Sequence, residues 1–340
     1  MKEYLSKLAE KRDLTYDEAK AAMQNIMSGD ATDAQIGAFL IALKMKGESV
    51  EEISAFAQVM RQYSLKVTPK VDGTLVDVCG TGGDGKSTFN ISTASMFVVA
   101  AAGVPVAKHG NRSITSKSGS ADVLEALGVN IGLNVEQITA SIEKIGVGFM
   151  FAPQHHPAMK HVMPARKQLG VRTVFNILGP LTNPASAKAQ VMGVFDPDLT
   201  EKLANVFGLL GVEHAVVVHG EPGIDEISNV GNTKISELKD GAVTTYSLSP
   251  QDFGVGKADI QDILGSTAAD NAQTIKDIFS GADTGPKMDI VALNASAGLL
   301  VAGNADSLKN GYRQALDIIS SGKALKKLTE YVEYTKNVVH

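Results

Sequence analysis

Residues 74–88 read TLVDVCGTGGDGKST, an apolar run that predicts a β-strand, followed by a loop with four glycines. From Gly80 onward the loop satisfies the pattern G-x-x-x-x-G-K-[ST], in which backbone N–H groups cradle the phosphates of a nucleotide. Two alternatives follow. The protein is a nucleoside triphosphatase, or the same loop chemistry serves a different phosphorylated substrate.

The context of the loop is poor for a triphosphatase. In a nucleotide-binding loop of that type the helix begins at the Lys-Ser pair, here Lys86 and Ser87, but polar residues continue as far as Thr93. Such an enzyme also needs an acidic residue for Mg²⁺ after an apolar strand, and the most apolar strand, 215–218, ends in histidine and glycine. We therefore interpret the loop as an anion cradle at a helix N-terminus. The plainer alternative is a tight structural turn.

The composition indicates a soluble intracellular protein. The 340 residues are 44% hydrophobic and 20% charged, which is enough chain for one large α/β domain, a smaller domain and a sizeable core. A net charge of −5 provides no general basic field for nucleic acid. The N-terminus lacks a signal-peptide pattern, and no apolar run reaches the roughly 18 residues of a membrane span. The single cysteine, Cys79, suits a reducing compartment and core packing. We expect a cytoplasmic protein with neither nucleic-acid nor membrane partners.

The first 65 or so residues are expected to be helical. Three capping boxes mark helix starts, Thr15-x-x-Glu18, Thr32-x-x-Gln35 and Ser49-x-x-Glu52. After a linker at 66–73, short apolar runs alternate with amphipathic segments, which favours a mostly parallel sheet covered by helices on both faces. The expected strands are 74–79, 104–108, 147–151, 189–195 and 214–219, with a hairpin or edge strands over 232–247. The expected helices lie near 90–102, 119–128, 135–145, 200–210, 289–302, 307–321 and 323–338.

One stretch interrupts the alternation. Residues 156–183 contain two successive helical patterns without a strand between them. Such a pair could leave the α/β domain and pack on the N-terminal helices. We therefore expect a small helical domain from 1–68 with 156–186, and a large α/β domain from 72–155 with 187–340.

A second polar loop, KHGNRSITSKSGS, occupies residues 108–120 after the next expected strand. Ligands bind beyond the carboxyl ends of parallel strands in sheets of this kind. Two such loops from neighbouring strands would enclose a strongly anionic substrate. The alternative is a solvated basic loop.

A third candidate site is the acidic pair Asp225-Glu226, in a loop that contains glycine and proline. Adjacent carboxylates can both reach Mg²⁺, directly or through water, and Ser92 is a candidate oxygen ligand from the first loop. The alternative is a solvated acidic turn. The histidines at 155, 156 and 161 are not expected to bind a soft metal, because no cysteine is near.

Together these motifs resemble the anthranilate phosphoribosyltransferases of tryptophan biosynthesis, over nearly the whole chain. The motifs that carry the resemblance are DVCGTGGD (77–84), NIST (90–93), KHGNR (108–112), SGSAD (118–122), NILGPLTNP (176–184) and Asp225-Glu226. The resemblance implies that 80–85 is the GTGGDG segment of that family and that the Lys-Ser pair follows by chance. It also implies a small helical domain, a large α/β domain with a central mostly parallel sheet, an active site in the hinge cleft, and a homodimer formed through the helical domain.

The resemblance implies two small-molecule substrates, phosphoribosyl pyrophosphate and anthranilate. The residues implied for the sugar pyrophosphate are Gly80, Gly83, Asp84, Thr88, Asn90, Ile91, Ser92, Thr93, Lys108, His109, Gly110, Asn111, Arg112, Ser113, Ile114, Thr115, Ser116 and Ser120. Those implied for anthranilate are Gly80, Asn111 and Arg166, and those implied for two Mg²⁺ ions are Ser92, Asp225 and Glu226. No covalent catalytic residue is expected, and His109 is the candidate for assisting with a proton.

Two rival functions remain at this point. A pyrimidine nucleoside phosphorylase has a related architecture, but an enzyme that uses free phosphate has no need of an acidic pair for magnesium pyrophosphate. A non-enzymatic phosphosugar-binding regulator would not require a pocket for a second substrate.

Overall fold

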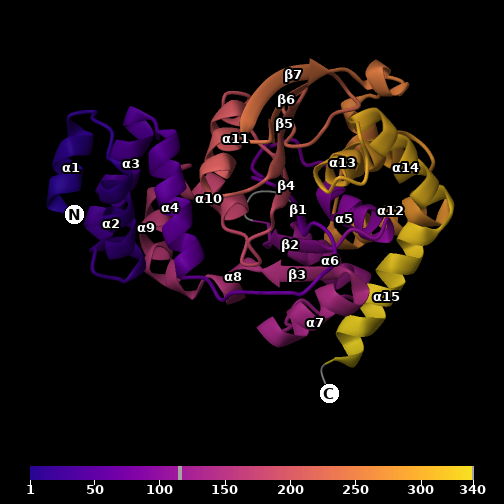
Figure 1. The fold of residues 1–340 in the computed structure, drawn as a ribbon, viewed down its shortest axis with the longest axis horizontal. Coiled ribbons are helices and arrows are strands. Elements are labelled where there is room, and N and C mark those ends of the chain that lie inside the picture. Colours follow the sequence, from indigo (N-terminus) through magenta and orange to yellow (C-terminus); the bar gives the residue numbers. More distant parts are fainter. Residues whose placement is uncertain (114–116, 339–340) are drawn as a thin grey trace.

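The N-terminal end of the molecule is a group of four helices, α1 (Lys2–Ala9), α2 (Tyr16–Met27), α3 (Asp33–Lys46) and α4 (Val50–Gln62). This arrangement is seen in a computed structural model that describes residues 1–113 and 117–338 (Figure 1). All three predicted capping boxes are formed, with the hydroxyl at each N-cap accepting from the backbone N–H three residues on. The helix starts read from the sequence are therefore confirmed.

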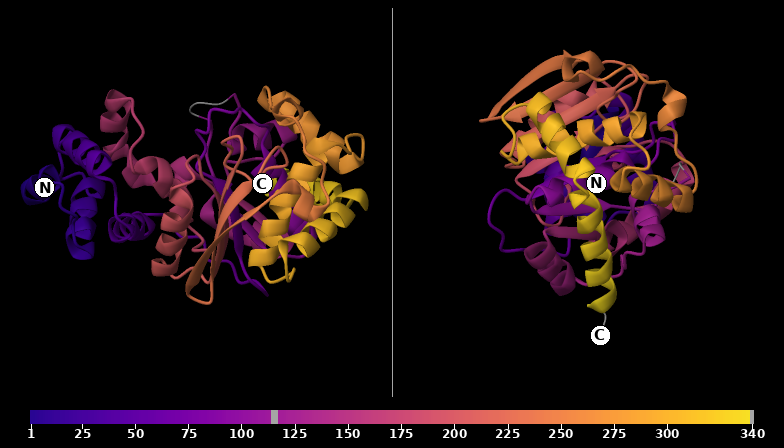
Figure 2. Two further views of the ribbon diagram at one scale, coloured as in Figure 1. Left: turned by 90° about the horizontal axis from the view of Figure 1, so that it is seen from above. Right: turned by 90° about the vertical axis from the view of Figure 1, so that its right-hand side faces the viewer.

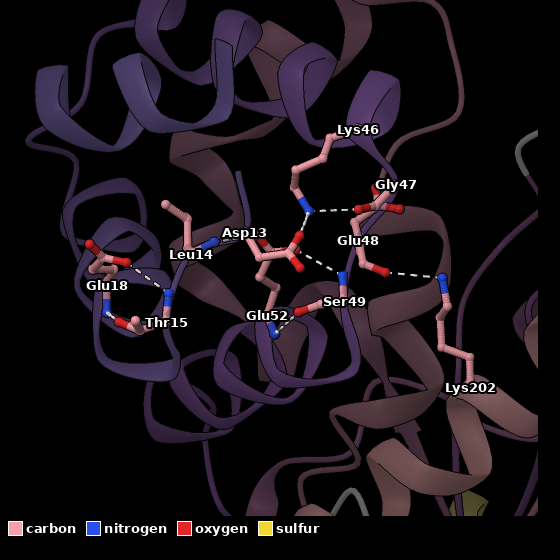
Figure 3. A network of polar contacts seen from close by, with 10 residues as sticks. All are labelled: Asp13, Leu14, Thr15, Glu18, Lys46, Gly47, Glu48, Ser49, Glu52 and Lys202. Atoms are coloured by element: carbon pink, nitrogen blue, oxygen red, sulfur yellow. Dashed lines mark hydrogen bonds and ion pairs between the residues drawn. The ribbon is translucent and has the colours of Figure 1, made fainter. Parts of the chain in front are cut away.

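A buried ion pair holds the turn between α3 and α4 (Figure 3). The carboxylate of Glu52 is fully buried and accepts hydrogen bonds from the Ser49 backbone N–H at 2.8 Å and from the Lys46 ammonium at 2.8 Å. In the same turn, the Glu48 carbonyl accepts from Lys202 Nζ at 3.0 Å. Because Lys202 lies in α11 (Leu199–Leu209), this bond ties the helical group to the α/β part.

A seven-stranded sheet lies at the centre of the α/β part, in the order β3-β2-β1-β4-β5-β6-β7. Its five parallel strands are β1 (Val76–Gly80), β2 (Val106–Gly110), β3 (Val147–Phe151), β4 (Ala189–Gly193) and β5 (His214–Gly220). The antiparallel hairpin β6 (Thr233–Lys239) and β7 (Ala242–Leu248) completes one edge. The five predicted strands and the predicted hairpin are confirmed, although β2 begins at Val106 rather than 104 and β4 ends at Gly193 rather than 195.

Helices cover both faces of the sheet (Figures 1 and 2). Alternate residues of β5 show the two sides: Val216 and Val218 join one core, whereas Ala215 and Val217 join the other. The first core includes residues of α5 (Ile91–Ala101), α6 (Ser120–Leu127), α12 (Ala268–Ser280), α13 (Pro286–Val301), α14 (Leu308–Ser320) and α15 (Lys323–Asn337). On the opposite face α11 packs near β5 and β6, and α7 (Val135–Ile145) packs near β3.

Helix α12 was not predicted from the sequence. Its signals were present, because Thr267 and Asp270 form a capping box at the start of the helix and Gly281 ends it in a left-handed conformation. Two short 3₁₀ helices precede it, η2 (Pro250–Phe253) and η3 (Ile260–Ile263).

The predicted break in the α/β alternation lies between β3 and β4. It contains α8 (Ala152–His155), η1 (Pro157–His161), α9 (Met163–Leu169) and α10 (Phe175–Leu181). Helix α9 contacts α3 and α10 contacts α4, and one core includes Phe39 together with Val162 and Leu178. This segment therefore packs on the N-terminal helices, as expected. None of the described helices has both the length and the apolarity that a membrane span requires.

Candidate active site

The glycine loop joins β1 to α5 and bends at Gly82, Gly83 and Gly85, where φ is 65°, 73° and 71°. L-residues rarely adopt these angles, so the bends depend on glycine. The following helix begins at Ile91 and not at the Lys-Ser pair, which agrees with the interpretation that the nucleotide pattern is coincidental. Asn90 occupies the N-cap position without capping the helix through its side chain.

The acidic pair is hydrogen-bonded to the glycine loop and to the start of α5. Asp225 Oδ2 accepts from the Gly82 backbone N–H at 2.7 Å, and Glu226 Oε1 accepts from the Ser92 backbone N–H at 3.1 Å. Burial and the nearby Asp84 carboxylate raise the pKa of Asp225 to about 6. Burial and the adjacent Asp225 raise the pKa of Glu226 well above its usual value. The two carboxylates therefore lie where negative charge is poorly compensated.

These residues fit a divalent cation that is shared with a bound substrate. Asp84 Oδ2 is buried and makes no hydrogen bond within the described part of the chain, close to the charges of Asp225 and Glu226. Within residues 1–113 and 117–338, no three His, Cys, Asp or Glu side chains are grouped tightly enough to hold a metal by themselves. Mg²⁺ commonly takes one or two carboxylates and completes its shell with water and substrate phosphates. The donor set matches that pattern.

Lys108 lies in β2, which runs to Gly110, so the second loop begins later than the predicted residue 108. The Lys108 side chain points inward and is buried, and its ammonium donates to the Val78 carbonyl and, at 3.2 Å, to Ser92 Oγ. Its positive charge lowers the pKa of Glu226 against the larger effect of burial. In this structure Lys108 is thus an internal counter-charge to Glu226.

The rest of the second loop folds back on the start of α6. The N–H groups of Ser113 and Gly119 both donate to Asp122 Oδ2, at 3.0 and 2.8 Å. Arg112 forms ion pairs with Asp122 at 2.9 Å and with Glu125 at 2.5 Å, so its charge is already compensated. The predicted residues Ile114, Thr115 and Ser116 lie outside the described residues. The first and second loops also meet directly, since Ser118 Oγ donates to Asn90 Oδ1 at 3.0 Å.

Several other predicted site residues are less accessible to a ligand than expected from the sequence. Ile91 and Thr93 are both buried. Ile91 belongs to the hydrophobic core, so its side chain is not available to a polar ligand. Thr88 forms an isolated β-bridge with Leu264. A side chain at Gly110 would collide with Phe149, which explains the need for glycine at the end of β2.

His109 lies in a buried polar network that the sequence analysis did not identify. The Asp77 carboxylate accepts from the His109 backbone N–H at 3.3 Å and from Asn183 Nδ2 at 2.7 Å, which fastens the segment after α10 to β1 and β2. His109 Nδ1 lies 3.2 Å from the Gly179 carbonyl, and its ring is centred 5.0 Å from that of His156. Burial lowers the pKa of His109 well below its usual value, so the imidazole is neutral. An aspartate inside the apolar run 75–79 was the available signal for this network.

Arg166 lies in α9, on the side of the molecule formed by the helical group. Its guanidinium stacks over the Phe175 ring, with Cζ 5.5 Å from the ring centre, and burial lowers its pKa. No hydrogen bond between described residues joins Arg166 to Gly80 or Asn111. The three residues implied for anthranilate therefore come from separate elements, and only Gly80 is in direct contact with the acidic pair.

Comparison with known proteins first defines the class. Residues 72–325 match the glycosyl transferase family, a/b domain, and residues 2–64 match the helical bundle domain of the same family. The protein is therefore a glycosyl transferase of this family.

Individual relatives narrow the assignment. The chain is 53% identical over 339 residues to the anthranilate phosphoribosyltransferase of Acetivibrio thermocellus, covering 100% of this chain and 98% of the relative. It is 54% identical over 330 residues to that of Methanocorpusculum labreanum, covering 97% and 96%. The chain belongs to the anthranilate phosphoribosyltransferase family.

Solved structures agree with this assignment. The anthranilate phosphoribosyltransferase of Thermus thermophilus superposes with a TM-score of 0.93 at 41% identity, covering 98% of this chain and 99% of that one. The Saccharomyces cerevisiae enzyme, solved in complex with PRPP and Mg, superposes with a TM-score of 0.88 at 28% identity, covering 98% and 97%.

Proposed function

We propose that the protein transfers the phosphoribosyl group of 5-phosphoribosyl 1-pyrophosphate to anthranilate, giving N-(5-phosphoribosyl)anthranilate and pyrophosphate in tryptophan biosynthesis. The observation that carries this proposal is the pair of bonds from the Gly82 and Ser92 N–H groups to Asp225 and Glu226. They bring a phosphate-type loop, a helix N-terminus and two carboxylates to one place, which suits a polyanion that arrives with a cation.

The reaction is expected to use two Mg²⁺ ions. Ser92, Asp225 and Glu226 would hold them together with the sugar pyrophosphate. The yeast relative was solved with PRPP and Mg. When bound, the metal supplies positive charge that neutralises the departing pyrophosphate. The protein contributes the carboxylates. Their raised pKa values mark a position where a cation would stabilise the ionised forms.

The sugar pyrophosphate would be bound by residues of the glycine loop, the start of α5 and the second loop. The N-terminus of α5 carries partial positive charge and points at the acidic pair, so it favours an anion there. The substrate-binding set is the one implied by the family resemblance, and Lys108 would act through Ser92 and the acidic pair, as its buried position indicates.

In the transfer, the amine nitrogen of anthranilate attacks C1 of the ribose, and the C1–O bond breaks with its electron pair leaving on pyrophosphate. The nitrogen then releases a proton. His109 is the proposed acceptor or relay, because it is neutral and its Nε2 is buried without a hydrogen bond among the described residues. No covalent intermediate is required.

Arg166 is proposed to clamp the carboxylate of anthranilate, in a pocket that Gly80 and Asn111 line. A guanidinium can bind a carboxylate through two parallel hydrogen bonds. Because Arg166 comes from the helical side and Gly80 from the α/β side, we propose a hinge between the two predicted domains, 1–68 with 156–186 and 72–155 with 187–340. Closing it would exclude water from the activated ribose. The proposal also includes a homodimer formed through the helical domain, and a cytoplasmic location.

A magnesium-dependent assay tests the function directly. Loss of anthranilate fluorescence, with stoichiometric release of pyrophosphate, is expected only when the sugar pyrophosphate and Mg²⁺ are both present. Phosphorolysis of thymidine or uridine without activity on the pyrophosphate donor would establish the nucleoside phosphorylase alternative instead. Binding of the donor without turnover of any aromatic amine would indicate a regulator.

A further inference from the structure

Arg172 contacts the glycine loop but belongs to none of the residue sets proposed above for substrates or metal. It lies in the link between α9 and α10, and its guanidinium donates to the carbonyl of Gly83 in the glycine loop. Its own backbone carbonyl accepts from Lys44 Nζ at 2.8 Å. Since Lys44 lies in α3, one residue contacts the helical group through its backbone and the glycine loop through its side chain.

Arg172 is also linked to the glycine loop through Phe195. The Arg172 guanidinium stacks on Phe195, with Cζ 4.5 Å from the ring centre. The Phe195 backbone N–H donates to Thr81 Oγ1 at 3.2 Å. Arg172 and the residue on which it stacks therefore hold two points of the loop, Gly83 and Thr81, while Asp225 holds Gly82 from another element.

The loop depends on such contacts because glycine restricts the backbone least. Gly82, Gly83 and Gly85 all have positive φ, and chains of this composition lose much conformational entropy when they are ordered. A charged donor makes a stronger hydrogen bond to a carbonyl than a neutral one. In a trans peptide the C=O and N–H groups point in opposite directions, so a bond from Arg172 to the Gly83 carbonyl directs the Asp84 N–H away from Arg172.

We propose that Arg172 is a positioning residue for the sugar pyrophosphate. It acts through the Gly83 carbonyl to keep the glycine loop in its bent form, and through Lys44 it makes the geometry of the loop depend on the position of α3. This inference rests on the proposed function, and it assigns to the link between α9 and α10 a part in donor binding rather than in anthranilate binding.

The test is steady-state kinetics on Arg172→Met with both substrates varied. Loss of one charge-assisted hydrogen bond is expected to raise the KM for the sugar pyrophosphate about 10-fold. The KM for anthranilate and the melting temperature should stay at their wild-type values. Arg172→Lys should recover part of the loss, because an ammonium can donate to a carbonyl but cannot stack flat on Phe195. Lys167→Met, which removes an exposed positive charge from α9, is the matched control and should behave as wild type.

Lys44→Met tests the other end of the connection. It should raise the donor KM in the same direction by a smaller factor, since the link loses its anchor on α3 while the guanidinium remains. A donor KM at the wild-type value in Arg172→Met, or an equal rise in both KM values, would overturn the positioning role. A wild-type donor KM in Lys44→Met would overturn the connection to α3. If the wild-type protein released no pyrophosphate with anthranilate, the proposed function itself would fail, which is a different result from an active enzyme unaffected by these substitutions.

Discussion

Gly80 leaves the space that the carboxylate of Asp225 occupies. A Cβ placed on Gly80 would collide with Asp225 Oδ2 and would lie 3.4 Å from the Asp225 backbone oxygen. At the end of the neighbouring strand, a Cβ on Gly193 would collide with the Asp225 carbonyl. The acidic pair can therefore lie on the ends of β1 and β4 because both strands finish in glycine.

Gly80→Ala is expected to impair catalysis more than stability. The new methyl group would push aside the end of a side chain rather than the main chain, breaking the bond from the Gly82 N–H to Asp225. Loss of a group that orients a metal ligand typically costs about 10- to 100-fold in activity or metal affinity. Turnover and the apparent magnesium constant should both worsen by that order, with the melting temperature nearly unchanged. Gly256→Ala, where a Cβ would contact nothing, is the control. Wild-type turnover in Gly80→Ala would contradict the placement of Asp225 in the metal site.

Replacing the acidic pair by amides, Asp225→Asn with Glu226→Gln, should reduce turnover by at least roughly 100-fold, since changes in the second shell of a metal alone approach that value. The amide oxygens can still accept from Gly82 and Ser92, so the loops should keep their positions. The rate should also lose most of its dependence on magnesium concentration. We would measure initial rates across a magnesium titration, and a variant that keeps its turnover would show that the metal binds elsewhere.

Arg166→Ala should weaken the binding of anthranilate. Removing a charged donor from a carboxylate costs about 1.5–3 kcal/mol, or roughly 10- to 100-fold in binding. The KM for anthranilate should rise by that factor, while the KM for the sugar pyrophosphate stays within about 2-fold. Steady-state rates with each substrate varied in turn provide the measurement. Arg166→Lys should have an intermediate KM for anthranilate, because an ammonium cannot form the two parallel hydrogen bonds that a guanidinium makes with a carboxylate. Equal changes in both KM values would remove Arg166 from the anthranilate pocket.

Asp77 should make the stability of the protein depend on pH. Burial raises its pKa from 3.8 to about 6, so the folded state holds this proton more tightly than the unfolded state does. Its contribution to stability is therefore fully present below about pH 4 and is lost as the pH rises through about 6. A shift of this size corresponds to on the order of 3 kcal/mol.

Asp77→Asn removes that titration. Its amide would also place a donor against Asn183 Nδ2, so the variant should be less stable at acidic pH by about 1–3 kcal/mol. The difference in unfolding free energy between the two proteins should shrink between pH 4 and pH 6. Denaturant titrations at several pH values would show this, and a difference that stays constant with pH would mean that Asp77 is ionised throughout.

The local elements were predictable because their determinants are local. Capping boxes such as Thr15 with Glu18 satisfy helix N–H groups within four residues, and the apolar runs at 76–80 and 214–220 form buried strands. The missed helix α12 had equally local signals in Thr267 and Gly281. The motifs at 77–84, 108–112 and 225–226 were also sufficient to indicate the family, which the comparisons confirm.

The sequence alone thus determined the types of secondary structure, the alternation that makes a parallel sheet, and the chemistry of the loops, since these follow from periodicity and from residue type. Only the tertiary structure decided which charges face one another. Three interactions join residues from separate elements: the charge of buried Lys108 acting on Glu226, the pairing of Arg112 with Glu125, and the contact from Arg172 to Gly83. Electrostatic and hydrogen-bond energies depend on distance and burial, and both are set when the elements pack.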